Sequence, residues 1–487
     1  MNLKNILKDI DIKPGIKMGN INISNVTDDS RKVIPGSLFI AAKGCSLDGA
    51  KFIKSAIGAG AKVVVAEKDF NFKGGALEIL VDDTRSALNT IADNFYGHPS
   101  GMLKVTGITG TNGKTTITYI LESIIKSSGS DAGIIGTINY RLKDKIFPAI
   151  NTTPGAIVLQ RMLAEMVRMK MGYAIMEVSS HSLDQGRSEK IRLDVAIFTN
   201  VTSDHLDYHK TTTNYFNAKK KIFKHLKPRG VAVLNVDDKK VASLKRSINN
   251  RVITYGIKQR ADVMARDIKL SMHGSSFIAL TPIGEMAMRT KLIGAHNISN
   301  ILAALASAIA LKLPKTAIIK GIESMERVPG RLEEVVSAQK FKVFVDFAHT
   351  EDALANVLGL LKGLTPKRIL TVFGCGGDRD KTKRPKMGKI ACKYSDHVIV
   401  TSDNPRFEDP GSILSDIERG IKGRFTNYNV VPGRRDAISV ALKSASEGDI
   451  VLIAGKGHEN YQIIRGRSLP FDDRNVALSI LRKMESK

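Results

Sequence analysis

The segment Gly110 to Thr116, which reads Gly-Thr-Asn-Gly-Lys-Thr-Thr, has the composition of a phosphate-binding loop. It lies between an apolar run at 102–108 and an amphipathic pattern at 117–124. Small residues let backbone N–H groups approach phosphate oxygens, a lysine reaches the terminal phosphates and a threonine hydroxyl can bind Mg²⁺. The segment therefore predicts a site for ATP or a similar triphosphate with Mg²⁺, formed by Gly110, Thr111, Asn112, Gly113, Lys114, Thr115 and Thr116. Because Ile108 occupies the first glycine position of the general motif, a glycine-rich turn with an incidental lysine is the alternative.

Two further polar segments directly follow apolar runs that we expect to be strands. One contains Glu177 in Glu-Val-Ser-Ser-His, and the other contains His205 in Asn-Val-Thr-Ser-Asp-His-Leu-Asp. Ends of neighbouring parallel strands meet at one edge of a sheet, so both segments should lie beside the phosphate loop. A carboxylate and an imidazole there could hold Mg²⁺ against the triphosphate, although a single histidine at a strand end is more often structural.

A second group of polar strand ends occurs near the C-terminus. Four expected strands run into the segments 346–350, 374–379, 402–406 and 455–459, which contain glycines, histidines, arginines and carboxylates. Each segment alone could be an ordinary strand-to-helix turn. Together they predict a second ligand-binding face, because open α/β sheets bind ligands at the carboxyl ends of their strands.

Length and strand spacing predict an α/β protein of three domains. The 487 residues exceed what one hydrophobic core usually supports. We expect a small α/β domain at 1–98, a central domain with a mostly parallel sheet at 99–328, and a C-terminal Rossmann-like domain at 329–487. The sequence has no run of about 20 apolar residues and no apolar signal core, so we expect a cytoplasmic protein without a membrane span. Three scattered cysteines indicate neither disulfides nor a zinc site.

The net charge of +26 leaves the partner open between nucleic acid and anionic small molecules. The basic residues are spread along the chain, only 6% of residues are aromatic and there is no tryptophan. Because stacking platforms for bases are not evident, we expect no nucleic-acid partner. A compositional bias of the whole proteome would explain the charge equally well.

The motifs at 110–116, 177–181, 200–207 and 294–300 occur in an order and spacing that resemble the Mur ligase family over essentially the whole chain. The resemblance is strongest to members that add the third peptide residue to UDP-N-acetylmuramoyl-L-alanyl-D-glutamate. It implies that the N-terminal domain binds the UDP part of the substrate, that the central domain binds ATP and that the C-terminal domain receives the amino acid. The implied reaction proceeds through an acyl phosphate on the D-glutamate γ-carboxylate. We expect a monomer, with ATP and Mg²⁺ required.

The resemblance also assigns catalytic residues. It places Thr115 and Glu177 at one magnesium site, and His205 and Lys219 at another, with Lys114 on the phosphates. Lys219 would carry a carbamate (N6-carboxylysine), which requires a neutral amine and hence a lowered pKa. A solvated lysine run at 219–221 is the alternative. Further ATP contacts are assigned to Asn297, Asp346 and His349, although Asn297 would serve equally well as a helix N-cap.

Contacts with the UDP-linked substrate are assigned by the same resemblance to three regions. In the N-terminal domain these contacts fall in Asp-Asp-Ser-Arg at 28–31 and in Cys-Ser-Leu at 45–47. In the central domain they fall in the polar loop at 151–153 and in a Ser-x-x-x-x-x-Gln-x-Arg pattern at 179–187. The assigned residues are Ser30, Cys45, Ser46, Leu47, Asn151, Thr152, Thr153, Ser179, Gln185 and Arg187.

The amino-acid substrate is predicted from the motif Asp-Asn-Pro-Arg at 403–406. Relatives that use meso-diaminopimelate carry this motif, whereas relatives that use L-lysine lack its arginine. A diamino diacid needs cations for its carboxylates and an acceptor for its distal ammonium. The expected contacts are Arg379, Asp403, Asn404, Pro405, Arg406, Gly455 and Glu459.

Other function classes remain to be tested. A folylpolyglutamate synthetase shares the phosphate loop and the ligase chemistry but would not need the Asp-Asn-Pro-Arg motif. A nucleotide-dependent binding module would need neither two magnesium sites nor an amino-acid pocket. ATP turnover that requires both substrates would exclude the binding module.

Overall fold

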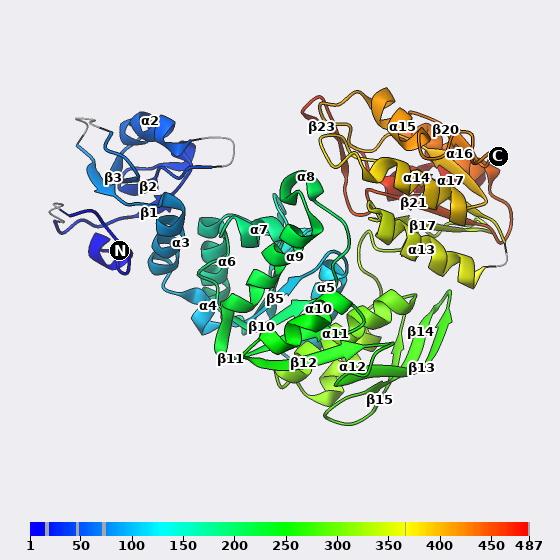
Figure 1. Cartoon of the computed structure of the whole chain (residues 1–487), viewed down its shortest axis with the longest axis horizontal. Helices are drawn as coiled ribbons and strands as arrows, with labels where there is room; N and C mark the ends of the chain where they lie inside the picture. Colours follow the sequence, from blue (N-terminus) through cyan, green and yellow to red (C-terminus); the bar gives the residue numbers. More distant parts are fainter. Residues whose placement is uncertain (15–18, 45–47, 71–74, 366, 486–487) are drawn as a thin grey trace.

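The computed structural model describes residues 1–14, 19–44, 48–70, 75–365 and 367–485. Its N-terminal unit is a four-stranded parallel sheet in the order β1-β2-β3-β4 (Figure 1). Alternate side chains of the apolar strands pack on opposite faces, against α1 and α3 on one face and against α2 on the other. The bounds are α1 (Leu3–Ile6), β1 (Asn25–Thr27), β2 (Ser37–Ile40), α2 (Ile53–Gly58), β3 (Ala61–Ala66), β4 (Leu77–Leu80) and α3 (Thr84–Phe95).

The central unit is built on an eleven-stranded sheet in the order β15-β14-β13-β12-β11-β10-β5-β9-β6-β7-β8. The run from β13 to β6 is parallel, and both ends of the sheet continue as antiparallel strands. The bounds are β5 (Lys104–Thr109), β6 (Ala132–Ile135), β7 (Asn139–Leu142), β8 (Lys145–Pro148), β9 (Tyr173–Glu177), β10 (Leu193–Phe198), β11 (Leu226–Asn235), β12 (Arg251–Gly256), β13 (Val263–Ser271), β14 (Gly274–Leu280) and β15 (Met286–Thr290).

Helices cover both faces of this sheet because its parallel strands are apolar on both sides. The helices α5, α11 and α12 pack on one face, while α6 packs on the other and also contacts α3 of the N-terminal unit. The helix bounds are α4 (Pro99–Met102), α5 (Lys114–Ser127), α6 (Ala156–Arg168), α7 (Ser180–Asp184), α8 (Leu206–His209), α9 (Thr212–Lys220), α10 (Lys239–Ser243), α11 (Ala295–Ala310) and α12 (Lys315–Glu323).

The C-terminal unit is a six-stranded sheet in the order β16-β17-β21-β18-β19-β20, parallel except for β16. Helices α13, α14 and α15 pack on one face and α16 and α17 on the other. The bounds are β16 (Glu333–Glu334), β17 (Lys342–Asp346), α13 (Glu351–Leu364), β18 (Ile369–Phe373), α14 (Lys383–Tyr394), β19 (His397–Val400), α15 (Pro410–Glu418), β20 (Tyr428–Val430), α16 (Arg434–Ser444), β21 (Ile450–Ala454), β22 (Tyr461–Ile464), β23 (Arg467–Pro470) and α17 (Asp473–Glu485).

The observed architecture confirms the predicted three-part α/β fold with a parallel central sheet. The three large sheets lie at 25–80, 104–290 and 333–454, and β22 and β23 form a separate two-stranded sheet, while the boundaries at residues 98 and 328 stay predictions. The antiparallel strands at both ends of the central sheet were not foreseen. Within the described ranges, no helix is both long enough and apolar enough to cross a bilayer.

Candidate active site

The predicted phosphate loop connects the central strand β5 to the N-terminus of α5. Gly110 and Gly113 have positive φ angles of 144° and 91°. A Cβ atom on Gly110 would lie 1.8 Å from Thr199 Oγ1, so the loop tolerates no side chain there. Lys114 Nζ donates to the carbonyls of Gly110 and Thr111 at 2.9 and 3.0 Å, which holds the ammonium across the loop. Burial lowers the pKa of Lys114.

Glu177 at the end of β9 is the central carboxylate of the site. Its oxygens accept hydrogen bonds from the hydroxyls of Thr115, at 3.0 and 3.1 Å, and of Thr137, at 2.8 Å. Only 1% of Glu177 is exposed. A buried carboxylate beside a phosphate-loop hydroxyl is an oxygen donor set that suits Mg²⁺. The described residues contain no cluster of three His, Cys, Asp or Glu side chains that could hold a metal by themselves.

Lys219 on α9 points into the same site and is 2% exposed. Its Nζ donates to Gly110 O at 2.8 Å and lies 4.5 Å from the Tyr215 ring centroid. Burial, and then the charge of Lys114, lower the pKa of Lys219 well below its ordinary value. The alternative of a solvated lysine run is therefore wrong for Lys219, and the direction of its pKa shift is the one that carbamate formation requires.

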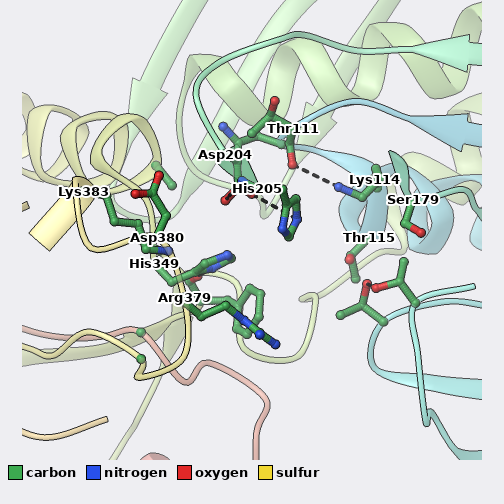
Figure 2. Close-up of a pocket in the computed structure, with 18 of the residues that line it drawn as sticks. Thr111, Lys114, Thr115, Ser179, Asp204, His205, His349, Arg379, Asp380 and Lys383 are labelled. Atoms are coloured by element: carbon green, nitrogen blue, oxygen red, sulfur yellow. Dashed lines mark hydrogen bonds and ion pairs between the residues drawn. The ribbon is translucent and has the colours of Figure 1, made fainter. Parts of the chain in front are cut away.

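His205 follows β10 and has a left-handed backbone, with φ of 54°. Its Nε2 lies 3.4 Å from Asp204 Oδ2, and its ring packs edge-on against His181 with centroids 4.8 Å apart. Burial lowers the pKa of His205 to about 3, so the imidazole is neutral and can act as a metal ligand. Figure 2 shows His205 and Asp204 between the phosphate loop and the side chains of the C-terminal unit.

The C-terminal unit closes the other side of a cavity of about 350 Å³. His349, Arg379 and Lys383 face Lys114 and Thr115 across this cavity (Figure 2). A second cavity of about 430 Å³ adjoins the phosphate loop and is lined by Asn297 and Asp346. The first cavity thus joins residues that the sequence placed in separate domains, and the second has the position expected for the rest of a nucleotide.

Arg331 lines both cavities and was not identified from the sequence. Its Nη2 lies 3.3 Å from Thr115 Oγ1, and its guanidinium carbon lies 4.7 Å from the Phe347 ring centroid. The carboxylate of Asp346 accepts a hydrogen bond from Leu332 N at 2.6 Å, which fixes the adjoining backbone. The only signal in the sequence was a cation in the Pro-Gly-Arg turn at the expected domain boundary.

Asn297 lies inside α11 and is not its N-cap, because Gly294 occupies that position. Its amide donates to Ile293 O at 2.9 Å, and its carbonyl oxygen accepts a hydrogen bond from Asn300 at 3.2 Å. The alternative interpretation of Asn297 as an N-cap is therefore wrong. Both side chains also line the second cavity.

The predicted amino-acid contacts gather at the ends of β18, β19 and β21. Arg406 Nη1 donates to Gly377 O at 2.8 Å, and Asn404 Nδ2 donates to Glu459 Oε2 at 2.8 Å. Arg379, Asp403 and Gly455 line the same cavity, while Pro405 contributes a carbonyl that accepts Glu408 N. Burial and then the charge of Arg379 lower the pKa of Arg406, so the two cations create a region that favours anions.

Lys456 is a fully buried cation in this cluster that the sequence analysis did not single out. Its Nζ donates to Asn404 Oδ1 at 3.0 Å and to Glu459 Oε2 at 3.3 Å. Glu459 is therefore already paired before any ligand ammonium arrives. The Gly-Lys-Gly-His-Glu sequence contained this lysine, but nothing in it indicated a buried ion pair.

The residues predicted to bind the UDP-linked substrate are only partly brought together. Thr153 Oγ1 donates to Glu177 O at 2.8 Å, Ser179 N donates to Thr153 Oγ1 at 3.0 Å, and Arg187 Nη1 donates to Thr153 O at 2.7 Å. Nearby, Thr152 contacts Thr137, Gln185 contacts Tyr208, and Asn151 O accepts from Tyr140. Ser30 lies apart from these residues, in a turn of the N-terminal unit, and Cys45, Ser46 and Leu47 fall outside the described residues.

Comparison with known proteins agrees with this fold and site. Residues 22–96 match the Mur ligase family catalytic domain, residues 108–308 match the Mur ligase middle domain, and residues 330–457 match the Mur ligase glutamate ligase domain. The chain belongs to the Mur ligase family, whose members are ATP-dependent enzymes of the ligase class.

Three similar proteins within the family are named for the same activity. The chain is 44% identical to UDP-N-acetylmuramoyl-L-alanyl-D-glutamate--2,6-diaminopimelate ligase of Geobacillus thermodenitrificans, over 96% of each chain. It is 43% identical to the enzyme of the same name from Listeria monocytogenes, over 99% of each. A solved structure of a 2,6-diaminopimelate ligase of this type superposes with a TM-score of 0.70 and 32% identity, covering 100% of this chain and 99% of that one.

Proposed function

We propose that the protein joins meso-2,6-diaminopimelate to the D-glutamate γ-carboxylate of UDP-N-acetylmuramoyl-L-alanyl-D-glutamate, at the expense of ATP. The observation that carries the proposal is one cavity lined both by the phosphate-loop residue Lys114 and by Arg406 with Glu459. The names of the similar proteins support the choice of substrates.

The proposed reaction has two steps. The γ-carboxylate oxygen attacks the γ-phosphorus of ATP, the bond from that phosphorus to the bridging oxygen breaks, and ADP leaves. The amine of diaminopimelate then attacks the acyl carbon, and phosphate leaves with the C–O bond electrons while the nitrogen loses a proton. Lys114 and the phosphate-loop amides stabilise the transferring charge, and much of the rate arises from holding the reactants in line.

We further propose that Thr115 and Glu177 hold one Mg²⁺, and that His205 and carbamoylated Lys219 hold another. Bound magnesium would neutralise phosphate charge and orient phosphate oxygens. The neutral imidazole of His205, the hydrogen-bonded carboxylate of Glu177 and the buried amine of Lys219 support these assignments.

We assign the UDP-linked peptide to the side of the cavity lined by Thr152, Ser179 and Glu177, with Arg187 placed beside it by its contact with Thr153. Arg187 is already anchored to Thr153 O, which orients its guanidinium for an anionic group. The carboxylates of diaminopimelate are assigned to Arg379 and Arg406. Its distal ammonium is assigned to Glu459 and the Gly455 carbonyl.

Phosphate release tests this function. Purified protein would be incubated with ATP, Mg²⁺ and the UDP-linked dipeptide, together with meso-diaminopimelate, with L-lysine or with no amino acid. Released phosphate would be quantified, and the mass of the product would be measured by mass spectrometry. We expect phosphate and a tripeptide mass only with diaminopimelate. Use of lysine would overturn the amino-acid assignment, and turnover without any amino acid would indicate a nucleotide-hydrolysing module.

The carbamate on Lys219 has a test of its own. Protein equilibrated with ¹³C-bicarbonate should show a carbamate carbon signal by NMR that K219M lacks. We expect K219M to lose about 100-fold or more in kcat, because one electrostatic contact to the transferring group would disappear. The neighbouring K220M variant serves as the control, and a signal that persists in K219M would exclude this site.

We also propose that the protein acts as a monomer in the cytoplasm, where ATP is available. No membrane-spanning helix is found in the described part of the chain, which is compatible with this location. Light scattering after gel filtration would give a mass near 53 kDa for a monomer. A dimer mass at micromolar concentration would contradict the proposal.

A further inference from the structure

The segment 379–384 carries four cations at the mouth of the C-terminal sheet, and three of them have identified partners. Arg384 is fully buried and binds the carboxylates of Glu408 and Asp416. Lys381 lies 3.3 Å from Glu408 as well. Arg379 donates to the carbonyl of its neighbour Asp378 and was assigned above to diaminopimelate.

Lys383 is the remaining cation, and it is the first residue of α14. It lines the reaction cavity, and Figure 2 shows it beside Asp380 at the edge opposite Lys114. Among the described residues, its ammonium makes neither a hydrogen bond nor an ion pair within 4.0 Å. The Asp380 carboxylate is instead occupied by the N–H and hydroxyl of Thr382. A half-buried ammonium without a protein partner that faces a reaction cavity is available to a ligand.

The groups that face Lys383 across the cavity are Asp204 and His349. Asp204 and His349 both line the reaction cavity together with Lys383. Burial and then the charge of Lys383 lower the pKa of His349 to about 4. Lys383 thus faces the loop that follows β10, from the side of the cavity opposite Lys114 (Figure 2).

Arg379 lies in the loop before α14, four residues earlier in the chain, and lines the same side of the cavity as Lys383 (Figure 2). Its charge acts on His181, which adjoins Ser179 on the side assigned to the UDP-linked peptide. Of the two cations, Arg379 acts on the side assigned to the acceptor peptide, and Lys383 acts on the loop that follows β10. A phosphoryl group that moves from ATP to the peptide would pass in front of the side of the cavity that carries both cations.

We propose that Lys383 is a catalytic cation that contacts the transferred phosphoryl group, first on the acyl phosphate and then on the departing phosphate. This inference rests on the ligase function proposed above. Lys114 holds the phosphates from the ADP side, and Lys383 provides positive charge on the opposite side, where charge accumulates once the bond to ADP has broken. The cation belongs to the C-terminal unit, so the amino-acid-binding unit would itself stabilise the intermediate that its substrate attacks.

The test compares K383M and K383R with K386M, a control on the same helix whose side chain is exposed and lies near Glu351. Acyl phosphate formation is measured with ATP, Mg²⁺ and UDP-linked dipeptide, by trapping with hydroxylamine in the absence of amino acid. Binding of ATP, dipeptide and diaminopimelate is measured by calorimetry, and folding by thermal denaturation. Wild-type protein is measured first, and its failure to form a hydroxamate would count against the proposed function itself.

We expect K383M to lower the trapping rate and kcat by about 100-fold or more, with each dissociation constant within about threefold of wild type. K383R should retain at least about tenfold more activity than K383M, and K386M should match wild type. Unchanged trapping in a folded K383M protein would overturn the proposal. So would a loss of diaminopimelate affinity with normal trapping, because Lys383 would then belong to the amino-acid site.

Discussion

Single side chains in the cavity are positioned by contacts from distant parts of the chain. Arg331, at the start of the C-terminal unit, reaches the hydroxyl of Thr115 on the phosphate loop, and its guanidinium stacks on Phe347. Because it lines both cavities, Arg331 lies where a triphosphate would pass from one to the other. Its planar fork of donors can contact two phosphate oxygens at once.

Replacement of Arg331 by methionine should therefore lower kcat by about 100-fold, because one preorganised donor to the phosphates would be lost. R331K should recover only part of the rate, since lysine keeps the charge but not the fork. Steady-state phosphate release at saturating substrates measures this effect. A change confined to the KM for ATP would show that Arg331 contributes to ground-state binding alone.

Arg406 should act on the amino acid and not on the nucleotide. R406A is expected to raise the KM for diaminopimelate by about 100-fold, because a carboxylate would lose a charged, partly buried partner. The KM for ATP should stay within about twofold of wild type. R424A, which removes an exposed arginine from the same unit, is the matched control. Equal effects on both KM values would point to a folding defect.

At the scale of elements, buried ion pairs fix the helices that carry the site. Arg384 on α14 binds Glu408, which precedes α15, and Asp416 within α15. Glu408 also accepts a hydrogen bond from Asp378 N at 2.5 Å, next to Arg379. The carboxylates therefore connect the two helices to the loop that presents Arg379, and they fix the first turn of α14, which carries Lys383.

This connection predicts a pH dependence of stability. Hydrogen bonds from Arg384 lower the pKa of Glu408 to about 2, from an ordinary value of 4.5. The ionised carboxylate thus stabilises the fold above about pH 4.5, and this contribution is lost as the pH falls toward 2. The free energy of unfolding of E408Q should be about 2 kcal/mol lower than that of wild type at pH 7, and the difference should be smaller at pH 3, where part of the contribution is already lost.

Urea titrations of wild type and E408Q at the two pH values provide the measurement. E447Q, which changes an exposed glutamate near Lys340, should stay within about 0.5 kcal/mol of wild type at both. A difference between E408Q and wild type that is equal at pH 7 and pH 3 would refute the assigned role of the Glu408 charge.

At the scale of the whole molecule, the cavity that contains Lys114 and Lys383 forms where the C-terminal unit lies against the central unit (Figure 1). Asn112 on the phosphate loop donates to Asp352 on α13 at 2.8 Å. Met272, in the turn between β13 and β14, packs against the same apolar cluster as Leu360 of α13. The antiparallel extension of the central sheet thus supports the C-terminal unit from one side.

Replacement of Met272 by aspartate should weaken this arrangement. Loss of a partly buried methionine contact costs about 1 kcal/mol. It would lower about fivefold the ratio of molecules whose central and C-terminal units are in contact to molecules whose units have separated. Small-angle scattering with a non-hydrolysable ATP analogue should show a larger radius of gyration for M272D. H273D, at the adjacent exposed position, is the control, and an equal radius for both variants would refute the contact's role.

The sequence by itself determined the local chemistry of this protein. Three features were predictable from the sequence: the phosphate loop, the segments of Glu177 and His205, and the four polar strand ends of the C-terminal unit. Apolar runs predict where strands lie, and ligands of open α/β sheets bind at the carboxyl ends of those strands. The assignments of Lys219 and of the diaminopimelate contacts needed the family resemblance as well. Whether each assigned residue binds its ligand stays a prediction.

Only the tertiary structure decided which of these residues share a cavity. Arg331 meets Thr115 across 216 positions of sequence, and Lys383 on α14 of the C-terminal unit lines the same cavity as Asp204 of the central unit. The tertiary structure also showed that Lys219 is buried, that Lys456 is hydrogen-bonded to Asn404 and that Asn297 lies inside α11. Local periodicity reports which face of an element is apolar, but it carries no information about which distant element that face will meet. The burial of an amine such as that of Lys219, and therefore its pKa, depends on which distant elements pack around it.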